Sequence, residues 1–431
     1  MIKQIITTCH LLAATIIPLQ ATAQITVEEC HELARQNYPL LKKYDLIGST
    51  TSYTIKNINK GYLPQIAVNG QASYQSDVAT LPSALSDMLE NNGYNVKGLE
   101  KDQYKIGVDI NQLIWDGGNL SAQKEVAKKE EAVQTAQTDI DMYALKERVN
   151  NLFFGILLID ERIKQNKDLQ TLLSDNCRKL EAMLDNGTAM KADVDVMKAE
   201  YLGACQQYTE LASMKRSYQQ MLAIFIGKDM QSVSSLAKPK VAMPADTDNY
   251  RPELMYYSAL ISKTDAQREL LNASLLPKIS IFAQGYYGYP GYDMFNDMFD
   301  HDWTLNGIIG IRVSWNISSF YTDKNERRKL DLAKEQTETA RETFLFNNRL
   351  EYTKEAEAVE KYKSMIKEDA EIISLRTSVR QAAEAKLDNG IIDINNLLQE
   401  INRENNAQIS GSTHEIEMLK SIYDMKNTLN Q

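Results

Sequence analysis

This sequence of 431 residues contains few side chains that could carry out chemistry, and their spacing does not group them into a catalytic or metal-binding site. The four histidines are far apart and form neither a metal-binding cluster nor part of a Ser/His/Asp triad. No phosphate-binding loop with its lysine is present. The sequence therefore predicts no enzyme activity, no metal site and no cofactor. The histidines are His10, His31, His301 and His414.

Residues 1–23 have the pattern of an export signal peptide. Lys3 precedes a short apolar run, and Ala21-Thr22-Ala23 supplies the small residues of a cleavage site. We expect the mature chain to begin at Gln24. The alternative is a membrane anchor, but the run is short and interrupted by polar residues, and no other stretch approaches about 18 apolar residues.

Cysteine spacing and net charge exclude further classes of site. After removal of the signal peptide three cysteines remain, and this odd number leaves at least one thiol unpaired. Cys30, Cys177 and Cys205 match no metal-binding spacing, so we expect them in helix cores. The net charge of −10 and the lack of basic clusters argue against nucleic acid as a partner.

The sequence repeats itself with constant spacing between landmarks. The tetrapeptide LDNG occurs twice at a separation of 203 residues, which also separates Gly107 from Gly310. Two prolines of the first copy correspond to two of the second at a separation of 213. Such self-similarity predicts an internal duplication. The prolines are Pro39 and Pro64 against Pro252 and Pro277. The expected parts are a first structural repeat (24–230), a linker (231–249) and a second repeat (250–431).

Each repeat contains two segments in which apolar and polar residues alternate, as in strands with one apolar face. In the first repeat these segments start at Ile66 and Tyr104, with about 28 residues of polar loop between them. In the second repeat they start at Ile279 and Ile309. The expected strand pairs are 64–115 and 277–317. The glycine-rich and acidic stretch 285–303 lies between strands, so we interpret it as a loop rather than a phosphate-binding site.

The remaining segments have helical periodicity. A capping box at Thr26-Val-Glu-Glu29 predicts a helix that continues to about Asn59. Proline-free runs of 70 residues extend from Gly117 to Gly187 and from Phe320 to Gly390. At ~1.5 Å per residue each would form a helix of about 105 Å. Coiled-coil spacing of three and four residues joins Val149, Leu152, Ile156, Ile159 and Ile163.

LDNG marks the expected tip of a helical hairpin in each repeat, because Asn-Gly favours the left-handed end of a helix. The tips are expected at 187–193 and 390–396. The chain should re-enter a helix at Asp193 or Asn396, which are both suitable N-caps. The first returning helix should end near Phe225.

A membrane interpretation of the strands requires several chains. Four strands cannot close a barrel, and an open sheet edge is not tolerated in lipid, whereas three chains would supply twelve strands. The polar faces carry Gln71, Lys105, Asp109 and Arg312. Aromatic residues bracket the strands as membrane girdles would. The alternative is a soluble sheet. The aromatics are Tyr74, Tyr104, Tyr286, Tyr287 and Trp303 at one end and Trp115, Phe320 and Tyr321 at the other.

The order of these features resembles that of the TolC-like outer-membrane efflux proteins over nearly the whole mature chain. A short helix, GYLPQ, a strand pair, LIWDGG, a long helix, LDNG and a returning helix are followed by RPEL and a second round. The resemblance implies an internally duplicated α+β membrane protein. In this fold class, four strands per chain are pooled into a trimeric twelve-stranded β-barrel that continues into a long periplasmic α-helical, coiled-coil barrel.

The resemblance also implies a function. The homotrimer would lie in the outer-membrane lipid and extend into the periplasm as a passive exit duct for efflux or secretion. Its tips would contact a periplasmic adaptor protein and an inner-membrane pump, of the proton-driven or ABC type. The expected adaptor contacts are Gly187, Thr188, Gly390 and Ile391, and the expected barrel-lumen residues are Lys105, Asp109 and Arg312.

The family can carry an acidic ring at the periplasmic gate, and four residues are candidates here. Asp193 and Asn396 occupy matching tip positions, with Asp195 and Asp393 close by. Acids repeated around a trimer axis would attract cations. This sequence departs from the family pattern in its second copy, where Asn396 and Gln399 are amides. Asp193 could equally be a plain N-cap.

A soluble periplasmic coiled-coil adaptor, of the membrane-fusion type, is the alternative function. Such a protein would have one helical hairpin flanked by small β-domains. Two hairpins in register and strands with an apolar outer face argue against this alternative.

Overall fold

The computed structural model describes residues 24–240, 242–244 and 247–431 apart from residue 97. The predicted signal peptide, 1–23, therefore lies outside the described residues. The elements of the first half are α1 (Val27–Asn37), η1 (Pro39–Leu41), α2 (Lys42–Asn59), η2 (Lys60–Tyr62), β1 (Gln65–Tyr74), α3 (Ser83–Asn91), β2 (Asp102–Trp115), α4 (Asn119–Asp185) and α5 (Lys191–Ile226). Those of the second half are η3 (Met230–Val233), α6 (Pro252–Ser274), β3 (Lys278–Tyr289), α7 (Met294–Asp297), β4 (Thr304–Ser314), α8 (Ser319–Asp388) and α9 (Ile394–Leu429).

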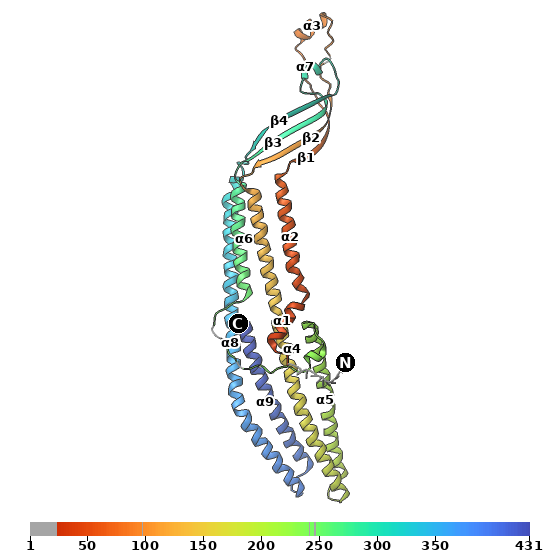
Figure 1. The fold of residues 1–431 in the computed structure, drawn as a ribbon, viewed down its shortest axis with the longest axis vertical. Helices are drawn as coiled ribbons and strands as arrows, with labels where there is room; N and C mark the ends of the chain where they lie inside the picture. The colour runs from red at the N-terminus through yellow and green to blue at the C-terminus, as the bar shows by residue number, and fades with distance from the viewer. Residues whose placement is uncertain (1–23, 97, 241, 245–246) are drawn as a thin grey trace, which may run out of the picture. The chain divides into compact units, whose positions relative to one another are not determined.

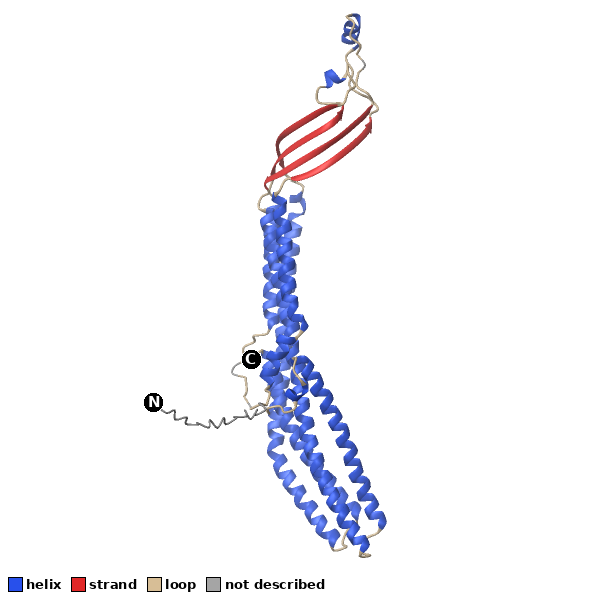
Figure 2. Cartoon of the chain, turned by 45° about the vertical axis from the view of Figure 1, so that its right-hand side comes forward, coloured by secondary structure: helices blue, strands red, loops and turns tan. Residues whose placement is uncertain are grey.

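The chain forms two compact units, and each combines parts of both sequence repeats. The sheet unit consists of residues 39–143 and 250–349. It contains the four strands, with α2, α6 and the first parts of α4 and α8 extending from one end of them (Figure 1). The hairpin unit consists of residues 24–38, 144–249 and 350–431. Its helices form two antiparallel pairs, α4 with α5 and α8 with α9 (Figure 2).

The four strands form one antiparallel sheet in the order β1-β2-β3-β4. The alternation of apolar and polar residues predicted all four, because this period matches the pleat of a strand. The sequence did not predict a β-bulge in β2 between Leu113 and Trp115, which inserts Ile114 into the ladder opposite β3. Trp115 thereby pairs with Ile279 and shares its face.

The predicted capping box opens α1, but the prediction of one helix to Asn59 was wrong. The Thr26 hydroxyl accepts from the Glu29 N–H at 3.2 Å, and the Glu29 carboxylate accepts from the Thr26 N–H at 3.0 Å. α1 then ends at Asn37, and Tyr38 is extended, with φ −71° and ψ 129°. The residue before a proline avoids the helical region, so Pro39 separates α1 from α2.

Both long helices end at the glycine of LDNG, as predicted. Gly187 has φ 73° and Gly390 has φ 68°. In the first copy the Gly187 N–H donates to Leu184 O and the Thr188 N–H to Met183 O, both at 2.9 Å. The second copy repeats these two bonds, which together form a Schellman motif. α5 likewise ends before a left-handed glycine, Gly227.

Two hydrophobic clusters form the core of the hairpin unit. The first joins α1, α4, α5 and α9 around Phe153, Phe154 and Leu222. Cys30 is fully buried in it, and burial raises the pKa of its thiol to about 12. The second cluster lies near the tips and joins both hairpins, with Met197 and Leu397 completely buried. Of the predicted coiled-coil positions, Val149, Ile156 and Ile159 are buried, and Leu152 and Ile163 are partly buried.

The loops beyond the sheet are more ordered than the sequence suggested. The first contains α3, and β3 extends to Tyr289, so the stretch 285–303 begins as strand rather than loop. Leu99, Tyr289 and Met298 form a small buried cluster between the two loops. The Tyr289 hydroxyl accepts from the Glu100 N–H at 2.9 Å and donates to Asp297 O at 3.2 Å. The two loops therefore stabilise each other through these contacts.

No helix among the described residues combines the length and apolar character needed to cross a bilayer.

Candidate functional site

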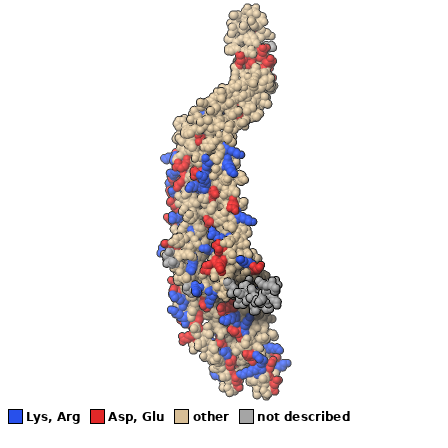
Figure 3. All heavy atoms as spheres, viewed as in Figure 1, with Lys and Arg blue, Asp and Glu red and all other residues tan. Residues whose placement is uncertain are grey.

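One face of the sheet is apolar in nearly every cross-strand row. Ile66, Ile110 and Ile309 belong to one such row, and their exposed fractions are 67%, 38% and 75%. Soluble monomers rarely expose contiguous apolar patches of such extent. In Figure 3 the strands are almost entirely free of charged residues on the side turned to the viewer. The large aliphatic side chains of this face are Ile66, Val68, Ile106, Val108, Ile110, Ile279, Ile281, Leu305, Ile309, Ile311 and Val313.

Gln112 is a polar residue on this face, opposite Ile281. Its side-chain amide donates to the backbone carbonyl of Tyr62 at 2.7 Å and to that of Leu113 at 2.9 Å. A polar group on an apolar surface is costly unless it is hydrogen-bonded, and here its donors are satisfied within the chain.

The opposite face of the sheet is polar and carries the predicted lumen residues. Lys105, Asp109 and Arg312 all lie on it, as the alternation predicted. Asp109 accepts a hydrogen bond from the Asn69 side chain. Lys105 Nζ lies 5.0 Å from the Tyr286 ring centre, and the Arg312 guanidinium lies 4.5 Å from that of Phe282. Cross-strand neighbours are Gln71 and Gly288 for Lys105, Ala67 and Gln284 for Asp109, and Ser280 for Arg312.

Lys278 also belongs to the polar face, although the sequence-based set of lumen residues omits it. Lys278 pairs with Ser314, two residues along each strand from the pair of Ser280 with Arg312. The sequence could have identified Lys278 as a polar-face residue, because it is the first polar residue in the alternating segment of β3. Phe282 is equally part of this face, but its contact with Arg312 depends on pairing between β3 and β4.

Aromatic side chains gather at both ends of the sheet. At the loop end, Trp303 stacks on Tyr104 with ring centres 6.3 Å apart and packs at a tilt against Tyr287 with ring centres 5.5 Å apart. At the helix end Trp315 packs edge-on against Phe320 at 6.3 Å. Tyr286 is also at the loop end, as predicted, but it occupies the other face of the sheet. Tyr286 pairs with Gly107 and Asn306, so it lies on the polar face.

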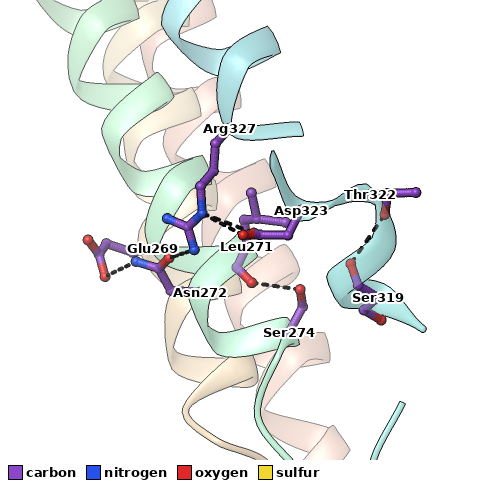
Figure 4. Close-up of polar contacts among 8 residues, drawn as sticks. All are labelled: Glu269, Leu271, Asn272, Ser274, Ser319, Thr322, Asp323 and Arg327. Atoms are coloured by element: carbon purple, nitrogen blue, oxygen red, sulfur yellow. Dashed lines mark hydrogen bonds and ion pairs between the residues drawn. The ribbon is translucent and has the colours of Figure 1, made fainter. Parts of the chain in front are cut away.

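Polar contacts tie α6 to α8 directly next to the sheet (Figure 4). Arg327 Nε donates to both Asp323 oxygens, at 3.0 and 2.9 Å, while its terminal nitrogen donates to Asn272 at 2.7 Å. Asn272 in turn donates to Glu269 at 3.3 Å. This network fixes the spacing of two helices where they meet β3 and β4.

The hairpin tips differ from the prediction in how their returning helices are capped. α5 begins at Lys191, and Asp193, two residues further in, accepts from the Met190 N–H at 3.0 Å. In the second copy Asp393 is the N-cap and accepts from the Asn396 N–H at 2.9 Å. Asp193 and Asn396 therefore still match in register, but neither is an N-cap. Each copy has a different half of a capping box. In the first copy Asp193 accepts from the N–H of the N-cap residue, and in the second the N-cap Asp393 accepts from an N–H inside the helix. One acidic residue therefore caps the returning helix at each tip.

The gate candidates are consequently not equivalent. Asp193 and Asp393 each accept a backbone hydrogen bond, and Asn396 also donates from its side chain to Asp393 at 2.8 Å. Asp195 is exposed on the first turns of α5. The predicted adaptor contacts Gly187, Thr188, Gly390 and Ile391 are all exposed.

Three of the four histidines lie in the described residues and remain apart. His31 contacts Asn150 at 2.7 Å, His301 contacts Glu100 at 2.9 Å, and His414 contacts Asp369 at 2.9 Å. His10 lies outside the described residues. Among the residues described, no cluster of histidine, cysteine or acidic side chains could hold a metal ion.

No pattern in the sequence indicated the half-buried carboxylate of Glu355, which lies on α8 beside α9. Its Oε2 atom is buried without a hydrogen-bond partner in the described part of the chain. Burial, with smaller contributions from Asp424 and Glu351, raises its pKa from 4.5 to about 7 despite a hydrogen bond with Thr428. The folded chain therefore retains this proton at a pH where the unfolded chain has lost it.

Glu355 should make the hairpin unit less stable as pH rises from about 4.5 to about 7, because the folded state binds more protons over that interval. Glu355→Gln should remove this slope and stabilise the protein at pH 8 by about 1–2 kcal/mol, after allowance for solvent screening. Unfolding followed by circular dichroism between pH 4 and 8 measures both effects. Glu360→Gln is the control, because its exposed carboxylate is paired with Lys363 on the same helix and does not contribute to the pKa of Glu355. Equal pH slopes in wild type and Glu355→Gln would contradict the assignment.

No protein-family model matches this chain, and no curated protein sequence does. Solved structures do match. The outer membrane protein VceC of Vibrio cholerae is 12% identical, with 94% of this chain and 95% of that chain covered at a TM-score of 0.66. The CmeC outer membrane channel of Campylobacter jejuni is 14% identical, with coverages of 94% and 85% and a TM-score of 0.64.

A third similar structure is the open state of the MtrE outer membrane channel of Neisseria gonorrhoeae. It is 13% identical, with coverages of 94% and 88% and a TM-score of 0.61. Identities of this size establish likeness of fold alone. The aligned portion includes 94% of this chain in all three comparisons, so the likeness extends over both sequence repeats. The chain therefore has the TolC-like fold that these outer-membrane channels share.

Proposed function

We propose that this chain is the outer-membrane exit duct of a tripartite efflux or secretion system. The observation that carries the proposal is the two-faced sheet. One face is aliphatic and exposed, the other is polar, and among the described residues β1 and β4 each lack a partner strand on their outer edge. An apolar face suits lipid, a polar face suits a water-filled pore, and unpaired edges in lipid must be closed.

Closure follows if three chains pair β4 of one copy with β1 of the next. The homotrimer then has twelve strands, which is an allowed even number for a membrane barrel. The aliphatic faces contact outer-membrane lipid, and Lys105, Asp109 and Arg312 line the lumen. The aromatic groups at the two ends of the sheet lie at the two membrane interfaces. Export through the predicted signal peptide delivers the mature chain, from Gln24 onward, to the cell envelope.

The helices form the periplasmic part of the duct, and the channel itself is passive. Energy comes from an inner-membrane pump, proton-driven or ABC, joined through a periplasmic adaptor. The adaptor contacts the hairpin tips at Gly187, Thr188, Gly390 and Ile391. Exposed apolar side chains support contact here, since Met190 is 73% and Ile391 is 69% exposed. A photoreactive residue at Thr188 should crosslink an adaptor in cells, whereas crosslinks only to unrelated proteins would exclude this contact.

Detergent-purified protein tests the proposed function directly. We expect particles with the mass of three chains that conduct ions when added to planar bilayers. A soluble, carbonate-extractable protein with one chain per particle would instead favour the periplasmic adaptor.

Asp195 is the best gate candidate of the four acidic and amide residues at the tips. Three copies around the axis would attract cations, as would Asp193 and, to a smaller extent, Asp393 beside Asn396. Asp195→Asn should lower the preference for K⁺ over Cl⁻ about two- to threefold in planar bilayers, because it removes charge without removing a cap. Asp193→Asn is the comparison variant, since it removes the same charge but also weakens the hydrogen bond that the Met190 N–H donates to Asp193. An unchanged reversal potential in Asp195→Asn would exclude Asp195 from the gate.

A further inference from the structure

The polar face of the sheet is positively charged, although the whole chain has a net charge of −10. Within the strands, its cations are Lys105, Lys278 and Arg312, and its carboxylate is Asp109. Two positive charges therefore remain in excess on this face. Charge lining a confined, water-filled space determines which ions enter it.

None of the three cations is neutralised locally. The ion pairs of the described residues include no pair with Lys105, Lys278 or Arg312. Asp109 pairs with Gln284, four residues along β3 from the Ser280 that pairs with Arg312. At about 3.3 Å per residue this separates the carboxylate from Arg312 by about 13 Å along the strand, which is more than a Debye length at physiological salt.

Arg312 and Lys278 are neighbours on this face. Arg312 pairs with Ser280 and Lys278 pairs with Ser314, so the two cations lie diagonally across β3 and β4. Diagonal side chains on adjacent antiparallel strands are about 7–8 Å apart, within reach of each other for long residues. Like charges at this separation repel, and an anion between them would remove the repulsion.

The Arg312 guanidinium is held in place by an aromatic ring. Its carbon lies 4.5 Å from the Phe282 ring centre, and Phe282 covers Gly310, where an added Cβ would meet the ring at 2.9 Å. The glycine leaves room for the ring, and the ring supports the guanidinium by a cation–π contact. One face of the guanidinium is thus occupied, while its N–H groups remain available for an acceptor.

We propose that Arg312 and Lys278, flanked by the Ser280 and Ser314 hydroxyls, form a binding site for multivalent oxyanions such as phosphates. A planar guanidinium, an ammonium and hydroxyl donors are the groups that bind such anions. The inference rests on the proposed function, because three chains around one lumen bring six of these cations to the helix-side end of the barrel. Cargo carrying phosphate, sulfonate or several carboxylate groups is favoured there.

Inorganic tripolyphosphate tests the site in single-channel recordings across bilayers of zwitterionic phosphatidylcholine, in which no anionic lipid competes. We expect micromolar to millimolar tripolyphosphate to block the wild-type current. Arg312→Gln together with Lys278→Gln should weaken the block at least tenfold, whereas Arg312→Lys should weaken it less than threefold. Lys105→Gln is the matched control, since it removes a ring-stacked cation from the same face at the other end of the sheet, and it should change the block less than threefold.

The possible outcomes distinguish failure of the proposed oxyanion site from failure of the proposed channel. Channels that conduct but resist tripolyphosphate, or a double variant blocked as strongly as wild type, would overturn the site and leave the duct intact. Equal weakening by Lys105→Gln would overturn the local pair in favour of diffuse lumen charge. A trimer-sized particle without any conductance would overturn the duct, and the site with it.

Discussion

Arginine at Ile309 should prevent stable insertion of the protein into a membrane, whereas arginine at the adjacent Ile308 should be tolerated. Ile309 pairs with Ala283 on the apolar face and is 75% exposed, and Ile308 pairs with Gln284 on the polar face and is 44% exposed. A lipid-facing arginine near the bilayer midplane costs about 2–4 kcal/mol, and a homotrimer would pay this three times. On the polar face, which we propose lines the lumen, the same side chain would stay in water.

The two variants have the same composition and charge, so they differ only in the face that receives the arginine. Insertion into liposomes, followed by the yield of detergent-resistant trimer, measures the effect. We expect Ile309→Arg to reduce the inserted fraction at least tenfold and Ile308→Arg to leave it within twofold of wild type. Equal yields for both variants would mean that the aliphatic face does not contact lipid, and equal loss would mean that position 308 also lies outside the pore.

Features that depend on short stretches of sequence were predictable. The alternation from Ile66 and from Ile309 identified strands and their faces, because a period of two has one structural meaning in a sheet. Gly187 and Gly390 identified the hairpin tips, because a left-handed helix end favours glycine. The lumen candidates Lys105, Asp109 and Arg312 follow from the same alternation, so the sequence alone places them on one face.

Features that depend on pairing between distant segments were missed. The bulge before Trp115 depends on how β2 pairs with β3, and the Phe282–Arg312 contact depends on β3 beside β4. The incorrect prediction of Asp193 as an N-cap has a different cause. The actual N-cap, Met190, has no capping side chain, so the sequence favoured the nearest acidic residue instead. Pro39 is itself a local signal for a break in the helix, but the prediction gave more weight to the helical periodicity on both sides of it.

Loss of the Arg380 side chain should destabilise the second hairpin by about 3–5 kcal/mol, because it would leave a buried carboxylate without its charge partner. Glu404 of α9 is 6% exposed, and it accepts hydrogen bonds from Arg380 Nε and, at 2.6 Å, from the Thr377 hydroxyl, both on α8. Arg380 also contacts Glu384 at 2.8 Å. Hydrogen bonds to a charged, buried carboxylate are among the stronger contacts between two helices.

Arg380→Met alone and together with Glu404→Met separates a charge effect from a packing effect. The double variant should recover most of the lost stability, because apolar side chains of similar volume replace both charges. Denaturant unfolding and hydrogen exchange of α9 measure this. Lys363→Met is the control, since Lys363 and its partner Glu360 on α8 are 57% and 62% exposed, and their pair should contribute about 0–1 kcal/mol. A double variant as unstable as the single one would mean that Arg380 acts through packing of its stem.

The position of this pair gives its loss a functional consequence as well. Glu404 is one helical turn from Ile401 and two turns from Leu397, both buried in the cluster that joins the two hairpins near their tips. If α8 and α9 are locked together there, the second hairpin would move as one body in any opening of the proposed duct. Arg380→Met should then raise hydrogen exchange in α9 before it changes exchange in α5, and conductance should become noisier without a change in ion preference. Uniform acceleration of exchange in both helices would show instead that the charge pair stabilises the whole hairpin unit rather than this hairpin alone.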